Sequence, residues 1–287
     1  MVETTTRRYR PLLTDAAKPA TFEVEAVNER GEMVPTAVAG EHPLTLYLDK
    51  KELVTLMTLG HAPEALAIGY LRNQRLVGAL KDITAVQVDW ETDSCAITTR
   101  KGLKGAKDLK KKLGKRTVTS GCGQGTMFGN LMDEIDQVKL RKDVTLGDEQ
   151  LFTLIDKVRK YETIYKQAGA VHGCALATRE GEILMFVEDV GRHNAVDAIA
   201  GFMWLEAIDG SDKLFYTTGR LTSEMVIKCA QMRIPFLVSR SGLTQMGFEI
   251  AQKTGITMLG RASGRHYLAF TGRQRLVRTA PQPTAIA

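Results

Sequence analysis

Hydrophobic and polar residues alternate in several short runs of the N-terminal third of the chain, which is the pattern of strands with one face in a core. Residues 22–26 and 44–48 follow this pattern. One helix interrupts the strands, because Pro63 suits a first helical position and an apolar stripe follows it. We therefore predict a strand-rich N-terminal lobe over residues 21–115, preceded by a mobile tail over residues 1–20.

The second half of the chain has a different hydrophobic pattern, in which apolar runs of strand length alternate with stretches that have the periodicity of amphipathic helices. A long helix is expected from Thr145, with an apolar face from Leu151 to Tyr165. This alternation indicates an α/β layer sandwich with a mainly parallel sheet over residues 146–275, followed by a tail over residues 276–287. The later strands are expected at 171–178, 182–188, 213–217, 236–239 and 256–259, and the later helices at 194–208, 222–232 and 244–254.

Composition narrows the class of protein. With 44% hydrophobic and 25% charged residues over 287 positions, the chain has the composition of a globular protein. No run approaches the roughly 18 uncharged apolar residues that a membrane-spanning helix needs. The first 21 residues are polar and lack the apolar segment of a secretory signal. We therefore expect a cytoplasmic protein.

The net charge of +6 is concentrated in two places. Nine Lys or Arg residues and a single acid lie between residues 100 and 116, and five arginines lie between Arg261 and Arg278. Such runs are either solvated surface or attract phosphate-bearing ligands and acidic partner proteins. Nucleic acid is disfavoured as a partner, because no helix-turn-helix, zinc finger or aromatic stacking motif accompanies the charge.

The four cysteines, at positions 95, 122, 174 and 229, lack the spacing of a disulfide framework or a zinc knuckle. Three of them lie in apolar strand-like or helical runs and are expected to be buried. Cys122 instead lies between two glycines, in a loop and connector expected over residues 116–145. A basic pair just upstream favours its thiolate, which is the nucleophilic form. The alternative is a small apolar residue buried beneath a turn.

Loops that combine glycine with arginine, and mostly with hydroxyl groups, follow four of the expected strands. In parallel sheets such loops form the ligand crevice, and helix N-termini with arginines suit phosphates. Their joint occurrence predicts a ligand with several phosphates. The candidate contacts are Arg192, His193, Gly219, Arg220, Ser239, Ser241, Gly260, Arg261, Ala262, Ser263, Gly264 and Arg265.

Several other side chains have more than one interpretation. His193 could exchange protons, contact a nucleotide or simply begin a helix. Glu188 and Asp189 are candidates for binding a base or ribose, with the alternative that Asp189 orients Arg192. His172 and Cys174 resemble a metal pair, but the remaining ligands of a zinc deaminase are missing from the sequence, so no metal site is predicted.

Seven segments of the chain match those of a known family: Glu188–Asp197, Thr218–Arg220, Ser223–Lys228, Ile234–Pro235, Ser239–Ser241, Gly255–Thr257 and Ser120–Gly123. In these segments the chain resembles the formate dehydrogenase accessory sulfurtransferases, the FdhD family. This resemblance implies a cytidine-deaminase-like α/β lobe without zinc, beside the smaller strand-rich lobe, in a protein that is usually dimeric. It also implies that a cysteine desulfurase passes sulfur to the loop cysteine. That cysteine, here Cys122, is expected to hand the sulfur to the molybdenum cofactor bis(molybdopterin guanine dinucleotide) before formate dehydrogenase receives it.

Two departures from the family pattern affect the expected mechanism. Gly125 occupies the position of a second loop cysteine, and Gly242-Leu243 stands where Ala-Pro is usual. Without a second thiol, Cys122 cannot release sulfide by forming a disulfide within the loop, so its persulfide passes sulfur on directly or an external thiol completes the step. The alternative function is a chaperone that binds the cofactor without moving sulfur.

Overall fold

The computed structural model describes residues 8–102, 117–118, 125–126, 138, 140–161 and 163–278. The chain forms two compact units. Unit 1 contains Met1–Asp133, Thr163–His172 and Val187–Ile208. Unit 2 contains Glu134–Glu162, Gly173–Phe186 and Asp209–Ala287. The sequence pattern had grouped residues 187–208 with the C-terminal lobe, whereas here they are part of unit 1.

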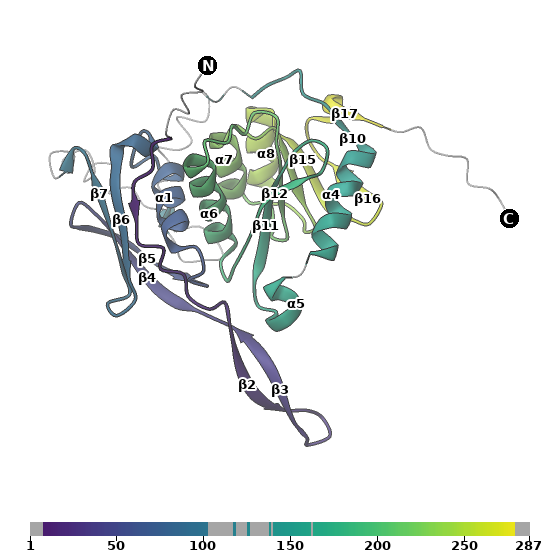
Figure 1. Ribbon diagram of the computed structural model, residues 1–287. Helices are drawn as coiled ribbons and strands as arrows, with labels where there is room; N and C mark the ends of the chain where they lie inside the picture. Colours follow the sequence, from purple (N-terminus) through teal and green to yellow (C-terminus); the bar gives the residue numbers. More distant parts are fainter. Residues whose placement is uncertain are drawn as a thin grey trace, which may run out of the picture. The chain divides into compact units, whose positions relative to one another are not determined.

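Unit 1 is built on a five-stranded sheet with the order β1-β6-β7-β4-β5, in which β1 pairs parallel with β6 and β4 with β7. A separate hairpin, β2–β3, extends away from this sheet (Figure 1). The unit's elements are β1 (Leu12–Leu13), β2 (Thr21–Val27), β3 (Met33–Ala39), β4 (His42–Leu48), β5 (Lys51–Thr58), α1 (Pro63–Asn73), η1 (Leu80–Asp82), β6 (Ile83–Asp89), β7 (Ser94–Thr99), β8 (Thr117–Val118), β9 (Gly125–Thr126), α5 (Ile164–Ala168) and α6 (Arg192–Leu205).

The two long helices of unit 1 pack through glycine. A Cβ atom at Gly69 of α1 would lie 1.6 Å from the carbonyl oxygen of Asp197, and one at Gly201 of α6 would lie 1.9 Å from that of Ala65. Because no real Cβ tolerates such distances, both positions require glycine, and the helix backbones touch. The Asn73 side-chain amide also donates to the Asp197 carboxylate at 2.7 Å. These contacts explain why α6 belongs to unit 1.

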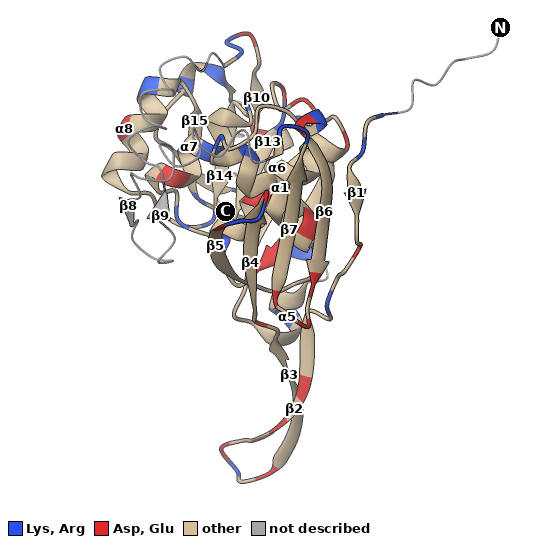
Figure 2. Ribbon diagram, turned by 90° about the vertical axis from the view of Figure 1, so that its left-hand side faces the viewer, with Lys and Arg blue, Asp and Glu red and all other residues tan. Residues whose placement is uncertain are grey.

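The β2–β3 hairpin differs from its sequence pattern in one respect. Its alternation predicts one buried face, but Phe22 and Val24 remain 43% and 40% exposed. Opposite residues in the antiparallel pair share a face, so Val38 lies beside Phe22 and is also exposed. The hairpin's charged residues are acidic except Arg30 (Figure 2).

Unit 2 is built on a six-stranded sheet with the order β12-β11-β13-β14-β15-β16. Strands β13, β14 and β15 are mutually parallel, whereas β11 and β16 pair antiparallel with their neighbours. The unit's elements are β10 (Leu146–Gly147), α4 (Asp148–Lys160), β11 (His172–Ala177), β12 (Ile183–Asp189), β13 (Leu214–Thr217), α7 (Ser223–Gln231), β14 (Phe236–Ser239), α8 (Gln245–Thr254), β15 (Thr257–Ser263), β16 (His266–Ala269), η3 (Arg273–Arg275) and β17 (Leu276–Val277).

Both faces of this sheet are buried. Helix α4 packs against one face, where Leu154 and Ile155 join Tyr216 and Val238 in the core. Alternate strand residues such as Phe215 point to the opposite face and are also inaccessible. The mixed α/β class is confirmed, but the expectation of a mainly parallel sheet is wrong, because β11 and β16 pair antiparallel with their neighbours and only β13, β14 and β15 are mutually parallel.

The helix predicted from Thr145 is shorter than expected. It ends at Lys160, because Tyr161 takes an extended ψ of 134° and leaves the helix. Tyr161 and Tyr165 are both exposed, so the part of the predicted apolar face beyond Val158 is wrong. Within the ranges that the structure describes, no helix combines the length and the apolar character needed to span a membrane.

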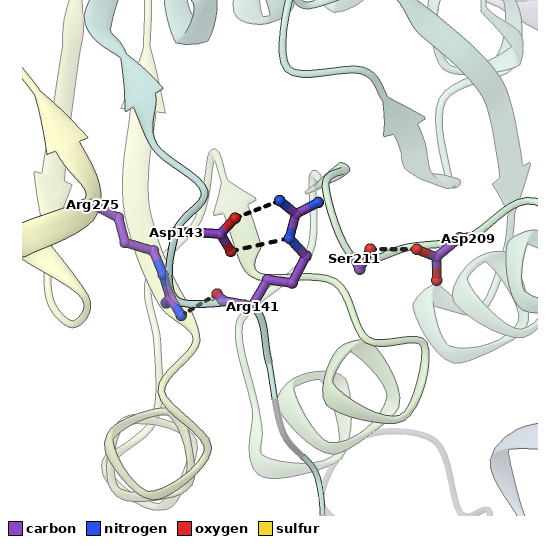
Figure 3. Close-up of polar contacts among 5 residues, drawn as sticks. All are labelled: Arg141, Asp143, Asp209, Ser211 and Arg275. Atoms are coloured by element: carbon purple, nitrogen blue, oxygen red, sulfur yellow. Dashed lines mark hydrogen bonds and ion pairs between the residues drawn. The ribbon is translucent and has the colours of Figure 1, made fainter.

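Arg275, one of the five C-terminal arginines predicted as a basic surface group, is buried instead (Figure 3). It donates to the backbone carbonyl oxygens of Arg141, at 2.7 Å, and of Gly255. Its guanidinium therefore joins the segment before β10 to the end of α8. The neighbouring Arg141 side chain pairs with Asp143, and that hydrogen bond lowers the pKa of the carboxyl to about 2.

Candidate functional site

The carboxyl ends of β13, β14 and β15 meet at one edge of the unit 2 sheet, and hydrogen bonds join the loops that follow them. The Ser239 hydroxyl donates to the carbonyl oxygen of Gly219 at 2.7 Å. It also accepts from the backbone N–H of Ser241 at 2.9 Å. The Arg261 N–H in turn donates to the Ser241 carbonyl oxygen at 2.9 Å. The structure thus brings these four predicted residues, from three loops, together.

Thr217, the last residue of β13, is hydrogen-bonded to two of the loops at the same edge. Its hydroxyl accepts from the Gly219 N–H at 3.1 Å and from the Cys174 thiol at 3.3 Å. The Thr217 carbonyl accepts from the Arg240 N–H at 3.2 Å. Ser239 and Thr217 are fully buried, so their hydroxyls shape the loops and cannot themselves contact a ligand. This assigns Ser239 a supporting role that the sequence did not distinguish.

Three arginine side chains are exposed on these loops: Arg220, Arg240 and Arg261. Arg261 has a φ of 52°, which a non-glycine residue rarely adopts and which recurs at functional positions. It lies at the irregularity in the β15–β16 ladder, next to Gly260. A Cβ at Gly260 would lie 3.0 Å from the Phe270 ring, so glycine at this position lets β15 run close beside that ring. Three guanidinium groups on linked loops can bind an anion with several phosphates.

Arg240 is the residue that sequence reasoning missed. The contacts predicted from the sequence in this loop are its neighbours Ser239 and Ser241, whose hydroxyl groups can bind a ligand. Its position in the sequence indicates its role, because Arg240 is the first residue after β14. Arg261 has a similar position, shortly after Leu259, the last residue of β15 that pairs with β14. In strands that alternate, the residue after a buried serine points away from the core.

The other members of the Gly260–Arg265 segment have different surroundings. Ala262 is buried in the core beneath α4, so only its backbone could contact a ligand. Arg265 donates to both carboxylate oxygens of Glu149, at 2.9 and 2.8 Å, and lies 5.0 Å from the Phe152 ring centre. Gly264, with a φ of 56°, forms the turn beside the exposed Ser263. The structure therefore ties Arg265 to α4.

The last residue of β12, Asp189, belongs to unit 1 and is a structural hub there. Its carboxylate is 4% exposed and accepts four hydrogen bonds from its own chain. They come from the Thr58 hydroxyl at 2.6 Å, Leu59 N–H at 3.0 Å, Gly191 N–H at 2.9 Å and the Asn194 amide at 2.8 Å. These bonds join the end of β5 to the start of α6. The interpretation of Asp189 as a base or ribose contact is not supported.

Glu188 is similarly occupied, since it accepts from the Ile164 and Tyr165 N–H groups at 2.7 and 3.2 Å. Burial raises the pKa of Glu188, and those hydrogen bonds oppose the rise. Arg192 and His193 begin α6 and are only 4% and 2% exposed. Both are placed inside the protein, so a ligand could reach them only if the surrounding residues made way.

Cys122 and the basic pair before it lie outside the described residues. The short strands β8 and β9 are described, and they pair through Thr117 with Thr126 and Val118 with Gly125. Cys122 lies between these two strands in the sequence. Cys95, Cys174 and Cys229 are buried as predicted, and burial raises the pKa of Cys95 and Cys229. Among the described cysteines, none is an exposed nucleophile.

Within the described part of the chain, no group of three or more His, Cys, Asp or Glu side chains is arranged to hold a metal ion. His172 and Cys174 lie two residues apart on β11 and so share a face of the strand, but Cys174 is fully buried and its thiol donates to the Thr217 hydroxyl. The site that the geometry offers is thus an arginine-lined edge for an anion.

The amino-acid sequence of this chain is similar to those of known proteins. A model of the FdhD/NarQ family matches residues 39–277. The sulfur carrier protein FdhD of Listeria monocytogenes is 29% identical over 245 residues, covering 85% of this chain and 92% of that protein. The protein of the same name from Wolinella succinogenes is 28% identical over 239 residues, covering 83% and 82%.

A solved structure also resembles this chain. The crystal structure of a protein from Desulfotalea psychrophila, described as a formate dehydrogenase accessory protein, superposes with a TM-score of 0.71. It covers 90% of this chain and all of its own, at 24% sequence identity. At that identity the match supports the shared fold.

Proposed function

The chain belongs to the FdhD/NarQ family, and from this premise we propose that it is a sulfur carrier in the maturation of formate dehydrogenase. In this proposal Cys122 accepts sulfur from a cysteine desulfurase and passes it to the molybdenum bis(molybdopterin guanine dinucleotide) cofactor. The names of the relatives support the sulfur-carrier role. The observation that carries the cofactor part is the hydrogen-bonded edge in unit 2 that presents Arg220, Arg240 and Arg261.

The first transfer is an exchange between sulfur atoms. The Cys122 thiolate attacks the outer sulfur of the desulfurase persulfide, a new S–S bond forms on Cys122, and the desulfurase cysteine leaves as a thiolate. No external oxidant or reductant is needed. The basic residues upstream of Cys122 favour the thiolate that begins this step.

The second transfer must work without a second loop cysteine, because Gly125 occupies that position within β9. If an external thiol attacks the inner sulfur of the persulfide, the outer sulfur leaves as hydrosulfide toward the acceptor. A mixed disulfide then remains on Cys122, and another thiol reduces it.

The cofactor is the substrate in this proposal, and its phosphates fit the described residues. Arginine binds phosphate through two parallel hydrogen bonds, and three exposed arginines provide several such pairs. Gly219 and Gly260 are buried, so the arginine side chains, and not these glycines, provide the contacts in this proposal. Arg192 and His193, by contrast, are buried, and we assign them no direct contact.

Two further features of the family are part of the proposal. We propose that the protein forms a homodimer, which light scattering of the purified full chain tests. The unit 2 sheet, with both faces buried, is compatible with the cytidine-deaminase-like layering that the family resemblance implies.

Guanosine diphosphate tests the proposed cofactor edge, because it carries the guanine and two phosphates. Arg261→Ala is expected to weaken its binding about tenfold, since a charge-assisted hydrogen bond contributes about 1.5–3 kcal/mol and 1.4 kcal/mol is a factor of ten. Arg278→Ala, which removes another exposed arginine of unit 2, is the matched control. Equal affinity of the Arg261→Ala and Arg278→Ala proteins would contradict the assignment.

A cofactor chaperone remains the second candidate, because the loop has one cysteine instead of two. Cys122→Ser separates the two functions in cells that depend on this protein for formate oxidation. A sulfur carrier with this substitution loses formate oxidation but still binds guanosine diphosphate. A chaperone keeps both.

A further inference from the structure

The β2–β3 hairpin of unit 1 has an apolar face that is open to solvent. Phe22, Val24 and Val38 lie on this face, because alternate residues of a strand and opposite residues of an antiparallel pair share a face. All three side chains are at least 40% exposed. A two-stranded ribbon with an uncovered apolar face is only marginally stable, and a third strand or a packed neighbour stabilises it.

The outer edge of β2 has unpaired backbone groups. At one end of the ladder the Asn28 N–H donates to the Glu32 carbonyl oxygen at 3.0 Å, and at the other the Gly40 N–H donates to that of Ala20 at 2.9 Å. Hydrogen-bonded pairs alternate with non-bonded pairs in an antiparallel ladder, so the even-numbered residues of β2 bond to β3. In the described part of the chain, β2 pairs with β3 alone. The outward N–H and C=O groups belong to Thr21, Glu23, Glu25 and Val27.

The two edges of the hairpin are not equivalent. Pro35 of β3 lies opposite Glu25, in a pair that exchanges no hydrogen bonds, so its missing N–H costs the ladder nothing. It does remove a donor from the outer edge of β3, which is a common way to block strand addition. Helix α5 also contacts β3 more extensively than β2. Strand β2 contains no proline, so an added strand would pair with β2.

Charge decides which kind of strand fits this edge. Residues 21–39 contain four glutamates and one arginine, in a chain whose net charge is +6 (Figure 2). Glu23 and Glu25 lie on the face opposite to Phe22 and Val24. In every antiparallel register that pairs the outward groups of two β2 strands, this acidic face meets itself. Like charges directly opposite each other are destabilising, so a second copy of β2 fits poorly.

We propose that the outer edge of β2 binds an extended segment of a partner protein in which basic residues alternate with apolar residues. Its basic side chains lie beside Glu23 and Glu25, and its apolar side chains cover Phe22 and Val24. Backbone hydrogen bonds provide affinity in such strand addition, and the alternating side chains provide selectivity. The proposed sulfur transfer uses none of these residues, so the two proposals can fail independently.

The test uses a fluorescein-labelled peptide in which four lysines alternate with three valines. Fluorescence anisotropy measures its binding to the full-length protein at low ionic strength. A peptide of the same composition, with its lysines grouped at one end, is the control for nonspecific attraction between charges. A peptide in which glutamate replaces each lysine is the control for the sign of the charge.

Two substitutions at one position separate the charge from the backbone. Glu23→Gln removes one carboxylate and should weaken the alternating lysine peptide about threefold. Glu23→Pro also removes an outward N–H group and should weaken it about tenfold. Since Glu23 lies in a pair that exchanges no hydrogen bonds, this proline leaves the β2–β3 ladder bonds in place, as Pro35 does. Glu91→Gln, at an exposed position in the same unit, is the matched control.

The proposal predicts that the alternating lysine peptide binds more tightly than either control peptide. It also predicts that affinity falls from wild type to Glu23→Gln and again to Glu23→Pro, while Glu91→Gln binds like wild type. Absence of binding, equal affinity for the two lysine peptides, or equal affinity of the Glu23→Pro and wild-type proteins would overturn it. Light scattering is measured in parallel, and a dimer that Glu23→Pro dissociates would assign this edge to a second copy of the chain and also overturn the proposal.

Discussion

Asp189→Asn tests whether the start of α6 depends on one buried carboxylate. Oδ2 receives the Thr58 hydroxyl and the Leu59 N–H, and Oδ1 receives the Gly191 N–H and the Asn194 amide. An asparagine has only one oxygen, so its NH₂ group faces either the Gly191 and Asn194 N–H groups or the Leu59 N–H and the Thr58 hydroxyl, of which only the hydroxyl can turn to accept. Two charge-assisted bonds, each contributing about 1.5–3 kcal/mol, are lost. Removing a buried charge offsets part of this loss.

The free energy of unfolding is therefore expected to fall by about 3 kcal/mol, measured by urea denaturation of the full chain. Thr58→Val provides an internal check, because it removes one of the four donors. In the wild-type background it should destabilise by about 1–2 kcal/mol. In the Asp189→Asn background it should cost less, since the Thr58 hydroxyl there bonds to a neutral group instead of a charged one. A fall below 1 kcal/mol for Asp189→Asn would refute the hub, as would strictly additive effects of the two substitutions.

Three further substitutions test other parts of the fold. Gly201→Ala places a Cβ 1.9 Å from the Ala65 oxygen, so it should lower the free energy of unfolding by about 2–3 kcal/mol in a urea titration, although alanine favours helices. Arg275→Met should lower the melting temperature by several degrees, because carbonyl groups that it now satisfies lose their donor. Burial and the hydrogen bond to Asp148 raise the pKa of Tyr267 to about 12, so the neutral phenol stabilises the fold and that contribution is lost as pH rises from about 10 to 12. Tyr267→Phe should remove this alkaline loss and delete the step near pH 12 from the phenolate absorbance titration.

The carboxyl-end loops of unit 2 could be predicted because topology alone constrains them. Parallel strands bring their carboxyl ends to one edge, so glycine and arginine after β13, β14 and β15 had to be neighbours. The inward or outward direction of each side chain was harder to predict. Ala262 is buried because β15 continues to Ser263 past the irregularity, which no local pattern revealed. Arg265 is tied to α4 by a residue more than a hundred positions earlier.

The association of α6 with unit 1 could not be predicted from the sequence, for a similar reason. It depends on Gly69 and Gly201, which are far apart in the sequence and individually resemble ordinary helical glycines. The β2–β3 hairpin shows the opposite case. The alternating pattern correctly predicted its strands, but the prediction that one face of the strands is buried was wrong. Phe22 and Val24 alternate with glutamates, yet their face has solvent where the pattern predicts a core. Alternation fixes which residues share a face and leaves open what covers that face.

The central claim is that Cys122 carries sulfur, and mass spectrometry of the protein tests it most directly. The purified chain is incubated with a cysteine desulfurase and cysteine, digested without reducing agent, and compared with Cys174→Ser and Cys122→Ser proteins. The account predicts one added sulfur atom on the peptide that contains Cys122, present in wild type and Cys174→Ser and removed by an external thiol. An unmodified Cys122, or an equal sulfur load on the Cys122→Ser protein, would contradict it.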